Sequence, residues 1–277
     1  MDELTRHALT RNVRDALEED TGSADWTSRL VDDSAVATAM LIVREAAVLC
    51  GRPWFDETLS QVDSRLRVSW KVEEGASMAP GQTVCEIQGP ARSLLTAERT
   101  ALNFLQMLSG VATATRRSVQ IVAGTRTRVL DTRKTLPGLR FAQKYAVRIG
   151  GGFNHRLGLF DGILIKENHI QAKGGIVAAL NAARELDAGV PIQIEVETLD
   201  ELVTALSAGA RSILLDNFSE LDMREAVRLN AGRAELEVSG GVSDATLRSI
   251  AEIGVDRISI GSLTKNVRAI DFSLRFV

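Results

Sequence analysis

Six short apolar runs recur through the second part of the chain, and no other feature constrains its fold as strongly. They are centred near residues 129, 163, 193, 213, 237 and 258, roughly 20 to 35 residues apart, with helical patterns between them. This alternation predicts a parallel sheet whose strands are joined by right-handed helical crossovers. Because a full barrel needs eight strands, six predict an α/β fold in the form of an open, incomplete barrel.

The same six runs end in charged residues or in glycine-containing turns, which can take part in catalysis or ligand binding. In chain order these are Asp131, Lys166, Glu195, Asp216, Ser239-Gly240-Gly241 and Gly261-Ser262. The C-terminal ends of parallel strands meet at one edge of the sheet, where α/β barrels place their active sites. The sequence therefore predicts a binding site at the barrel mouth.

The first part of the chain is organised differently. Residues 4–19 have helical spacing, residues 35–89 contain short alternating runs separated by turns, and residues 96–122 form a long helical pattern with Thr96 as its expected N-cap. This predicts an N-terminal α+β sandwich module in front of the barrel. The expected division is 1–110 joined by the tail 268–277 for the module, and 111–267 for the barrel domain.

Composition limits the class of function. The 277 residues carry a net charge of −3, which argues against a nucleic-acid partner. No apolar run approaches the roughly 18 residues of a membrane helix, and the N-terminus lacks a secretory apolar segment. We therefore expect a cytoplasmic protein without a membrane partner. Cys50 and Cys85 lie in apolar runs and are expected to be buried thiols.

Positive charge gathers in one stretch. Residues 133–173 contain eight lysines and arginines but only two acidic residues, a net charge of +6. Arg133 and Arg156 within it, and Arg99 upstream, could each grip a carboxylate with a bidentate guanidinium fork. His155 beside Arg156 adds a second donor. The pattern favours a pocket for a small polyanion over a merely solvated face.

Glycines mark two further features. Ser239-Gly240-Gly241 and Gly261-Ser262 close the last two strands, where backbone N–H groups and a helix N-terminus can hold a phosphate. In full barrels the last two strand ends often do this. Gly150-Gly151-Gly152 would let the backbone approach a ligand closely or move as a lid.

Two carboxylates end neighbouring strands. Glu195 and Asp216 hold these positions, and Glu197 is expected on the same strand face as Glu195. Buried carboxylates are costly unless they are paired or bind a metal. One interpretation is Mg²⁺, held together with substrate oxygens. The other is ion pairing with Lys134 or Lys166.

With these residues assembled, the chain resembles the quinolinate phosphoribosyltransferase family over essentially its whole length. The most specific matches read Asp-Thr-Arg-Lys-Thr-Leu-Pro-Gly-Leu-Arg at 131–140 and Asn-His-Arg-Leu-Gly at 154–158. The others are Glu98-Arg99-Thr100-Ala101-Leu102-Asn103, Ile165-Lys166-Glu167-Asn168-His169, Glu195-Val196-Glu197, Leu215-Asp216-Asn217, Val238-Ser239-Gly240 and Ile258-Ser259-Ile260-Gly261. The resemblance implies that quinolinate and phosphoribosyl pyrophosphate give nicotinate mononucleotide, pyrophosphate and CO₂, in NAD biosynthesis.

The resemblance also implies residue roles. The implied catalytic residues are Lys134, Lys166, Glu195 and Asp216, the last two near Mg²⁺ and the ribose hydroxyls. The implied substrate-binding residues are Arg99, Arg133, His155 and Arg156 for the quinolinate carboxylates, Lys134 and Lys166 for the phosphoribosyl donor, Ser239, Gly240, Gly241, Ile260, Gly261 and Ser262 for its 5′-phosphate, and Thr132. A homodimer is implied, with an active site shared across its interface and Arg44 reaching across it.

One departure and two alternatives accompany this interpretation. Many family members have a histidine where this chain has Lys265, so a cation is kept but a proton-transfer role is not carried over. A related barrel phosphoribosyltransferase acting on another ring acid is one alternative. A barrel aldolase using Lys134 or Lys166 as a Schiff base is the other, although it needs an apolar lysine pocket. The sequence leaves the role of Asp131 open, with a structural one favoured.

Overall fold

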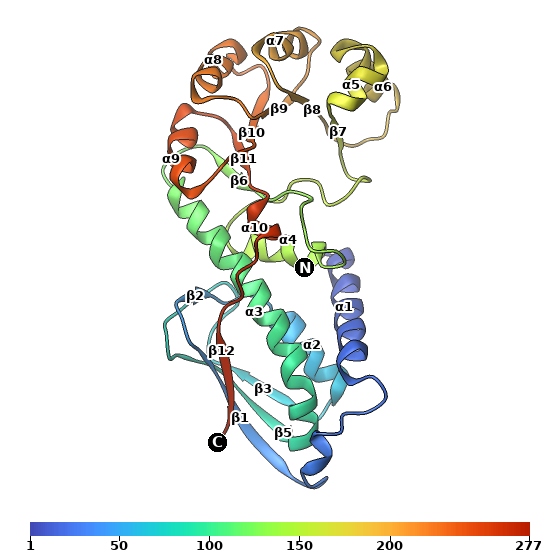
Figure 1. Ribbon diagram of the computed structural model, residues 1–277, viewed down its shortest axis with the longest axis vertical. Coiled ribbons are helices and arrows are strands. Elements are labelled where there is room, and N and C mark those ends of the chain that lie inside the picture. The colour runs from blue at the N-terminus through green and yellow to red at the C-terminus, as the bar shows by residue number, and fades with distance from the viewer. The chain divides into compact units, whose positions relative to one another are not determined.

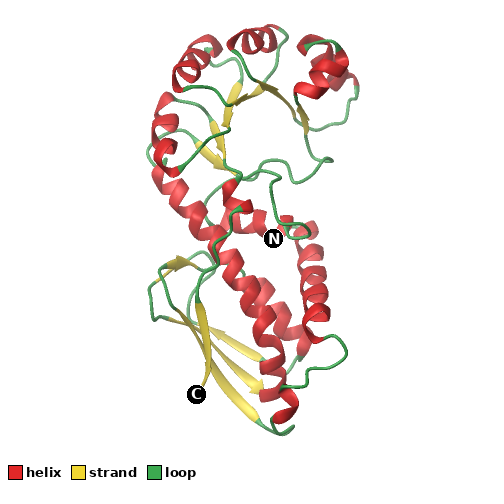
Figure 2. Ribbon diagram, in the orientation of Figure 1, coloured by secondary structure: helices red, strands yellow, loops and turns green.

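The computed structural model describes all 277 residues and divides into two compact units. The first unit comprises Met1–Arg116, Thr135–Gly151 and Ser262–Val277, and the second unit comprises Arg117–Lys134 and Gly152–Gly261. Residues Thr135–Gly151 thus belong with the N-terminal residues, whereas the sequence placed them in the barrel domain. None of the helices combines the length and apolar character that crossing a membrane requires. Figure 1 labels the elements and Figure 2 colours them by type.

An antiparallel sheet of four strands forms one layer of the first unit, in the order β12-β1-β5-β3 (Figure 2). Its strands are β1 (Val36–Val43), β3 (Arg67–Trp70), β5 (Thr83–Pro90) and β12 (Phe272–Phe276). Side chains alternate along β1, so that Ala39, Leu41 and Val43 are buried on one face. Leu41 pairs with Cys85 of β5 and Leu274 of β12, so the C-terminal tail completes this sheet.

Helices pack on that buried face. Phe55 and Leu59 of α2 and Leu105 of α3 share one core cluster with β1, and each large apolar side chain buried there stabilises the fold by about 1.5–3 kcal/mol. A second cluster joins α1, α3 and α4. The remaining elements of this unit are α1 (Glu3–Thr21), a 3₁₀ helix (Ser28–Leu30), β2 (Ala47–Val48), α2 (Arg52–Val62), β4 (Ser77–Met78), α4 (Arg140–Ile149), α10 (Ser262–Lys265) and most of α3 (Ala91–Ile121).

The second unit is a six-stranded parallel sheet with helices between its strands, which confirms the predicted fold class (Figure 1). The sheet order is β6-β11-β10-β9-β8-β7. Its edge strands β6 and β7 do not pair, and Leu130 instead bridges to Phe153, so the barrel stays open. The elements are β6 (Arg128–Leu130), β7 (Ile163–Ile165), α5 (Glu167–Lys173), α6 (Ile176–Glu185), β8 (Ile192–Val196), α7 (Leu199–Ser207), β9 (Ser212–Asp216), α8 (Glu220–Asn230), β10 (Glu235–Ser239), α9 (Asp244–Ile253) and β11 (Arg257–Ser259).

Two local predictions were wrong. The helix expected to begin after Thr96 begins at Ala91, directly after the strand β5. Thr96 therefore lies inside the helix, where its hydroxyl donates to Asp25 Oδ2 at 2.7 Å instead of capping. Glu197 does not continue the strand alternation of Glu195, because β8 ends at Val196. Its backbone N–H donates instead to Glu201 Oε2 of α7.

Candidate active site

Asp131 organises the end of strand β6. Its side chain is fully buried, and its two carboxylate oxygens accept hydrogen bonds from the His155 backbone N–H at 2.9 Å and from Asn154 Nδ2 at 2.5 Å. Backbone hydrogen bonds between β6 and Phe153 hold the same segment in place. A buried carboxylate needs such donors because it would otherwise be costly. The role that the sequence left open is therefore structural: Asp131 fixes residues 154–156 beside β6.

Two arginines at this position are close enough to influence each other electrostatically. Burial lowers the pKa of Arg156, and the positive charge of Arg133 lowers it further. Arg156 Nη1 donates to the carbonyl of Gly162 at 3.0 Å, whereas Arg133 Nε is buried without a hydrogen-bond partner. Buried donors are normally satisfied, and two adjacent guanidinium groups repel each other. Both features favour an anion between the two side chains, with a carboxylate as the best geometric match.

The ring of His155 is engaged by the protein on both sides. Nδ1 accepts a hydrogen bond from the Arg156 backbone N–H at 2.8 Å, and Nε2 lies 2.9 Å from Gln193 Oε1. The ring is thereby oriented together with the backbone that carries the Arg156 side chain. Its implied contact with a substrate carboxylate stays a prediction.

Gly150 has a packing role. A Cβ atom added there would lie 2.6 Å from the carbonyl oxygen of Ala112 and 2.6 Å from Thr115 Cβ, far inside van der Waals contact. The residue follows α4, whose end thus approaches α3 closely. Close packing against α3 therefore accounts for a glycine at position 150, and the expected ligand approach or lid movement stays a prediction.

Lys166 and Glu195 form an ion pair at the ends of adjacent strands. Lys166 Nζ lies 2.7 Å and 3.0 Å from the two carboxylate oxygens of Glu195. Parallel pairing of β7 with β8 brings the two residues together, with Ile165 opposite Ile194. The lysine side chain is half exposed and the carboxylate nearly buried. Of the two interpretations drawn from the sequence, ion pairing with Lys166 is therefore present in the structure.

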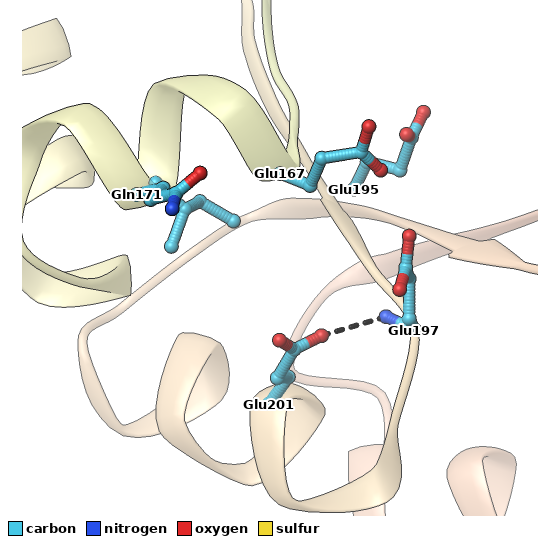
Figure 3. Close-up of a pocket in the computed structure, with 6 residues that line it drawn as sticks. Glu167, Gln171, Glu195, Glu197 and Glu201 are labelled. Atoms are coloured by element: carbon cyan, nitrogen blue, oxygen red, sulfur yellow. Dashed lines mark hydrogen bonds between the residues drawn. The ribbon is translucent and has the colours of Figure 1, made fainter.

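A pocket of about 270 Å³ opens beside this pair. Figure 3 shows Glu167, Glu195, Glu197 and Glu201 among the residues that line it. A hydrogen bond with Glu167 raises the pKa of Glu197, and nearby negative charges add to this effect. The pocket is lined by Glu167, Ile170, Gln171, Glu195, Glu197 and Glu201. This end of the sheet thus has a negative side, in contrast to the arginine pair.

Asp216 ends β9, and its Oδ2 accepts a hydrogen bond from Asn217 Nδ2 at 3.0 Å. Gly240 directly follows the next strand, β10, and its φ of 90° favours glycine. A Cβ atom there would lie 2.1 Å from Asn217 Oδ1. After β11, a Cβ atom at Gly261 would lie 2.9 Å from Lys134 Cδ. Both glycines therefore let polar side chains of the site approach the backbone; their implied phosphate binding stays a prediction.

Gly240→Ala should destabilise the protein by about 2–4 kcal/mol, because strain at positive φ adds to the clash with Asn217. The matched control is Gly254→Ala, whose φ of 97° is similar but whose added Cβ meets nothing within 4 Å. The control should cost only about 1 kcal/mol. Chemical denaturation of both variants measures the difference. Equal losses would contradict the close approach at Gly240.

The predicted residues divide between the two units. Arg44, after β1, and Arg99, on α3, are exposed residues of the first unit, and Ser262 begins α10 in the same unit. The others lie at or after strand ends of the second unit. These are Thr132, Arg133 and Lys134 after β6, His155 and Arg156 after the bridge at Phe153, Lys166 after β7, Glu195 in β8, Asp216 in β9, Ser239, Gly240 and Gly241 around the end of β10, and Ile260 and Gly261 after β11.

Two polar residues near the site were missed from the sequence. Gln193 of β8 and Glu237 of β10 are buried, and Gln193 Nε2 donates to Glu237 Oε2 at 3.0 Å. Polar residues within otherwise apolar parallel strands were the available signal, because such strands are normally apolar throughout. Asp161 was also missed; it accepts hydrogen bonds from the backbone of Leu157 and Gly158.

Comparison with known proteins gives a consistent result. Residues 111–275 match the family model "Quinolinate phosphoribosyl transferase, C-terminal domain", and residues 25–109 match the N-terminal domain of the same name. The chain is 43% identical over 277 residues to nicotinate-nucleotide pyrophosphorylase [carboxylating] of Mycobacterium leprae, covering 96% of each protein. It is 39% identical to the probable enzyme of that name from Bacillus subtilis, covering 92% of this chain and 89% of that protein. The solved nicotinate-nucleotide pyrophosphorylase of Francisella tularensis superimposes with a TM-score of 0.96, at 45% identity and full coverage of both chains.

Proposed function

The chain belongs to the quinolinate phosphoribosyltransferase family, and on that premise we propose how its residues carry out the family's reaction. The enzyme is a carboxylating nicotinate-nucleotide pyrophosphorylase: it converts quinolinate and phosphoribosyl pyrophosphate to nicotinate mononucleotide, pyrophosphate and CO₂, in NAD biosynthesis. The observation that supports the residue roles best is the pair Arg133 and Arg156, whose charges lie together with a buried, unused donor at Arg133 Nε.

Quinolinate is a pyridine with two adjacent carboxylates, and the arginine pair suits such a dianion. Each guanidinium can make a bidentate contact to one carboxylate. The mutual repulsion of Arg133 and Arg156 is relieved when negative charge lies between them. Asp131 holds the backbone N–H of His155, and the His155 ring holds that of Arg156. The contact geometry would therefore be set before the substrate binds, which would lower the entropic barrier to reaction.

Transfer forms a bond between the pyridine nitrogen and C1′ of the ribose, while the bond from C1′ to the pyrophosphate oxygen breaks. The bonding electrons leave with pyrophosphate, so positive charge develops on the ribose. In this scheme Glu195 and Asp216 would stabilise that positive charge, and Lys134 and Lys166 would stabilise the negative charge of the leaving group. Backbone N–H groups around Gly240, Gly241 and Gly261 would hold the 5′-phosphate.

Magnesium is proposed as the metal of this reaction. No group of three or more His, Cys, Asp or Glu residues is arranged to hold a metal ion by itself. Mg²⁺, however, is commonly bound by one or two carboxylates together with substrate phosphates, and Glu195 and Asp216 provide such a donor set. The residues present therefore fit a substrate-carried Mg²⁺, which would neutralise charge on the pyrophosphate.

Loss of CO₂ needs no organic cofactor in this scheme. Once the ring nitrogen carries the ribose it is cationic, and it draws in the electron pair released when the bond to the 2-carboxylate breaks. A proton then takes the place of CO₂ at that carbon. Contacts from Arg133 or Arg156 hold the ring in position during this step.

A homodimer with a shared active site is proposed as the working form. Arg44 and Arg99 are exposed arginines of the first unit, and the family resemblance assigns them to the substrate site. In a dimer with two-fold symmetry, each subunit would supply these arginines to the site of the other. Complementation between Arg99 and Arg133 variants distinguishes this arrangement from sites built within one chain. The cytoplasmic location likewise stays a prediction.

The Schiff-base alternative is not favoured by the contacts of Lys166. Its amino group donates to both oxygens of Glu195 and does not lie in the apolar pocket that activates such a lysine. The other alternative is a related enzyme that acts on a different ring acid. A ring acid such as nicotinate has one carboxylate where quinolinate has two, so the two enzymes would recognise different numbers of carboxylates.

Assays with matched ring acids test the function directly. With phosphoribosyl pyrophosphate and Mg²⁺, quinolinate should give nicotinate mononucleotide and CO₂, whereas nicotinate should react at least about 10³-fold more slowly because it lacks one carboxylate. Removing Mg²⁺ with a chelator should abolish turnover, and adding it back should restore it. Faster turnover of nicotinate, or full activity in the chelator, would contradict the corresponding proposal.

A further inference from the structure

Three polar side chains from separate parts of the second unit meet on one face of its sheet. Gln193 comes from β8, Glu237 from β10, and His155 from the segment beside β6. Gln193 Nε2 donates to Glu237 Oε2 at 3.0 Å, and Gln193 Oε1 lies 2.9 Å from His155 Nε2. The scheme for the transfer reaction assigns no role to Gln193 or Glu237.

Glu237, Gln193 and His155 form a line of hydrogen bonds, and the donor and acceptor groups of each side chain decide the direction of each bond. Gln193 points its amide NH₂ group toward Glu237, whose oxygen Oε2 accepts the hydrogen bond. Gln193 then presents its carbonyl oxygen to His155, and Nε2 of the ring must carry a proton to donate. On the other side of the ring, the Arg156 backbone N–H can only donate, so Nδ1 must be unprotonated. Both constraints select the same neutral tautomer of His155.

Glu237 is an unusual residue for its position. Its side chain is fully buried in a parallel sheet, where an apolar residue of similar volume is often at least as stabilising. Its second oxygen, Oε1, has no hydrogen-bond partner and lies 3.6 Å from His155 Nε2. A buried oxygen without a donor lowers stability. This arrangement is explained if the carboxylate is kept to orient the His155 ring beside it and not to stabilise the fold.

We propose that Glu237 is a positioning residue, which acts through Gln193 to fix the tautomer and orientation of His155. The ring in turn holds the Arg156 backbone N–H, while Asp131 holds the backbone N–H of His155. The line from Glu237 therefore ends at the backbone that presents Arg156 to the substrate. This proposal rests on the proposed function, because it assigns the network to quinolinate binding.

The test compares Glu237→Gln with the control Glu235→Gln. Both residues lie on β10, but Glu235 pairs with Arg128 and Arg257 and not with Gln193. In Glu237→Gln the two facing amides can flip, so Gln193 no longer has to present its oxygen to the ring. With only three histidines in the chain, ¹⁵N NMR of the imidazoles reads the tautomer of His155 without substrate. We expect the Nε2-protonated form in the wild type and in Glu235→Gln, and a mixture of tautomers in Glu237→Gln.

Kinetics provides the second readout. KM for quinolinate should rise about five- to tenfold in Glu237→Gln, as expected for loss of roughly one net hydrogen bond, while KM for phosphoribosyl pyrophosphate stays within about twofold. Gln193→Met keeps the side-chain volume but removes the hydrogen bonds to Glu237 and His155, so it should raise the quinolinate KM similarly. This second variant tests the proposal if Glu237→Gln does not fold. A wild-type tautomer with unchanged quinolinate KM would overturn the proposal, as would an equal rise of both KM values. Failure of the proposed function is distinct: the wild type itself would not turn over quinolinate.

Discussion

Replacing Arg133 by alanine is expected to lower kcat/KM for quinolinate by about 10³-fold. The variant loses a bidentate contact to a carboxylate, and two charge-assisted hydrogen bonds of about 1.5–3 kcal/mol each correspond to roughly 10²- to 10⁴-fold. Quinolinate-dependent release of CO₂ measures the loss. The free energy of unfolding should not fall, because Arg133 Nε has no hydrogen-bond partner within the fold. Removing the Arg133 charge also relieves its repulsion with Arg156.

The matched control is Arg211→Ala. Arg211 is exposed and lies just before β9, at the end of the sheet opposite to the strand ends that carry the site. Its removal takes away one positive charge from the same unit, so it reports any general effect of charge. The control should keep kcat/KM within about twofold. If Arg133→Ala released CO₂ at the rate of the control, the assignment of the arginine pair to quinolinate would be wrong.

The same variant tests the shared active site. Coexpressed Arg133→Ala and Arg99→Ala subunits should assort into dimers of which about half are mixed, and each mixed dimer has one site with both arginines if the site is composed across the interface. The mixture should then recover about a quarter of wild-type activity. If both arginines of a site came from one chain, no mixed dimer would contain a complete site, and activity would stay at the level of the single variants.

The fold was largely predictable because its signal is periodic. The strands centred near 129, 213 and 258 lie in apolar runs, and the parallel topology follows from the helices between the strands. Boundaries were less predictable, because local signals compete. Thr96 has the residue type of an N-cap, yet the helix starts at Ala91, since the strand before it ends at Pro90 and leaves no connecting loop.

The chemistry of the site was predictable from residue types, but its partners were not. The sequence offered Lys134 and Lys166 equally as partners for Glu195; only the pairing of β7 with β8 decides for Lys166, 29 residues away. Likewise, Gln193 meets Glu237 across 44 residues. Such contacts depend on which strands neighbour each other and on which face each side chain points, and neither is encoded in a local motif.

Glu195→Gln is the second variant with a large expected effect, here on kcat. Glutamine keeps the volume and can still accept a hydrogen bond from Lys166, but it removes the negative charge. That charge matters most when the ribose becomes positive in the transition state, so kcat should fall about 10²- to 10³-fold while KM for quinolinate changes little. Steady-state kinetics with each substrate varied in turn separates the two parameters.

Glu197→Gln provides the control within the same pocket. Glu197 lines it together with Glu195 but is exposed, and its carboxyl group interacts with that of Glu167 and not with Lys166. We expect kcat of the control to stay within about threefold, because neutralising one carboxylate of a crowded acidic pocket relieves repulsion and removes no contact to the ribose. Equal losses in the two variants would mean that the pocket acts only through its total charge. If kcat of Glu195→Gln stayed within threefold of the wild type, Glu195 would not stabilise the positive charge on the ribose. Asp216 would then be the carboxylate with that role.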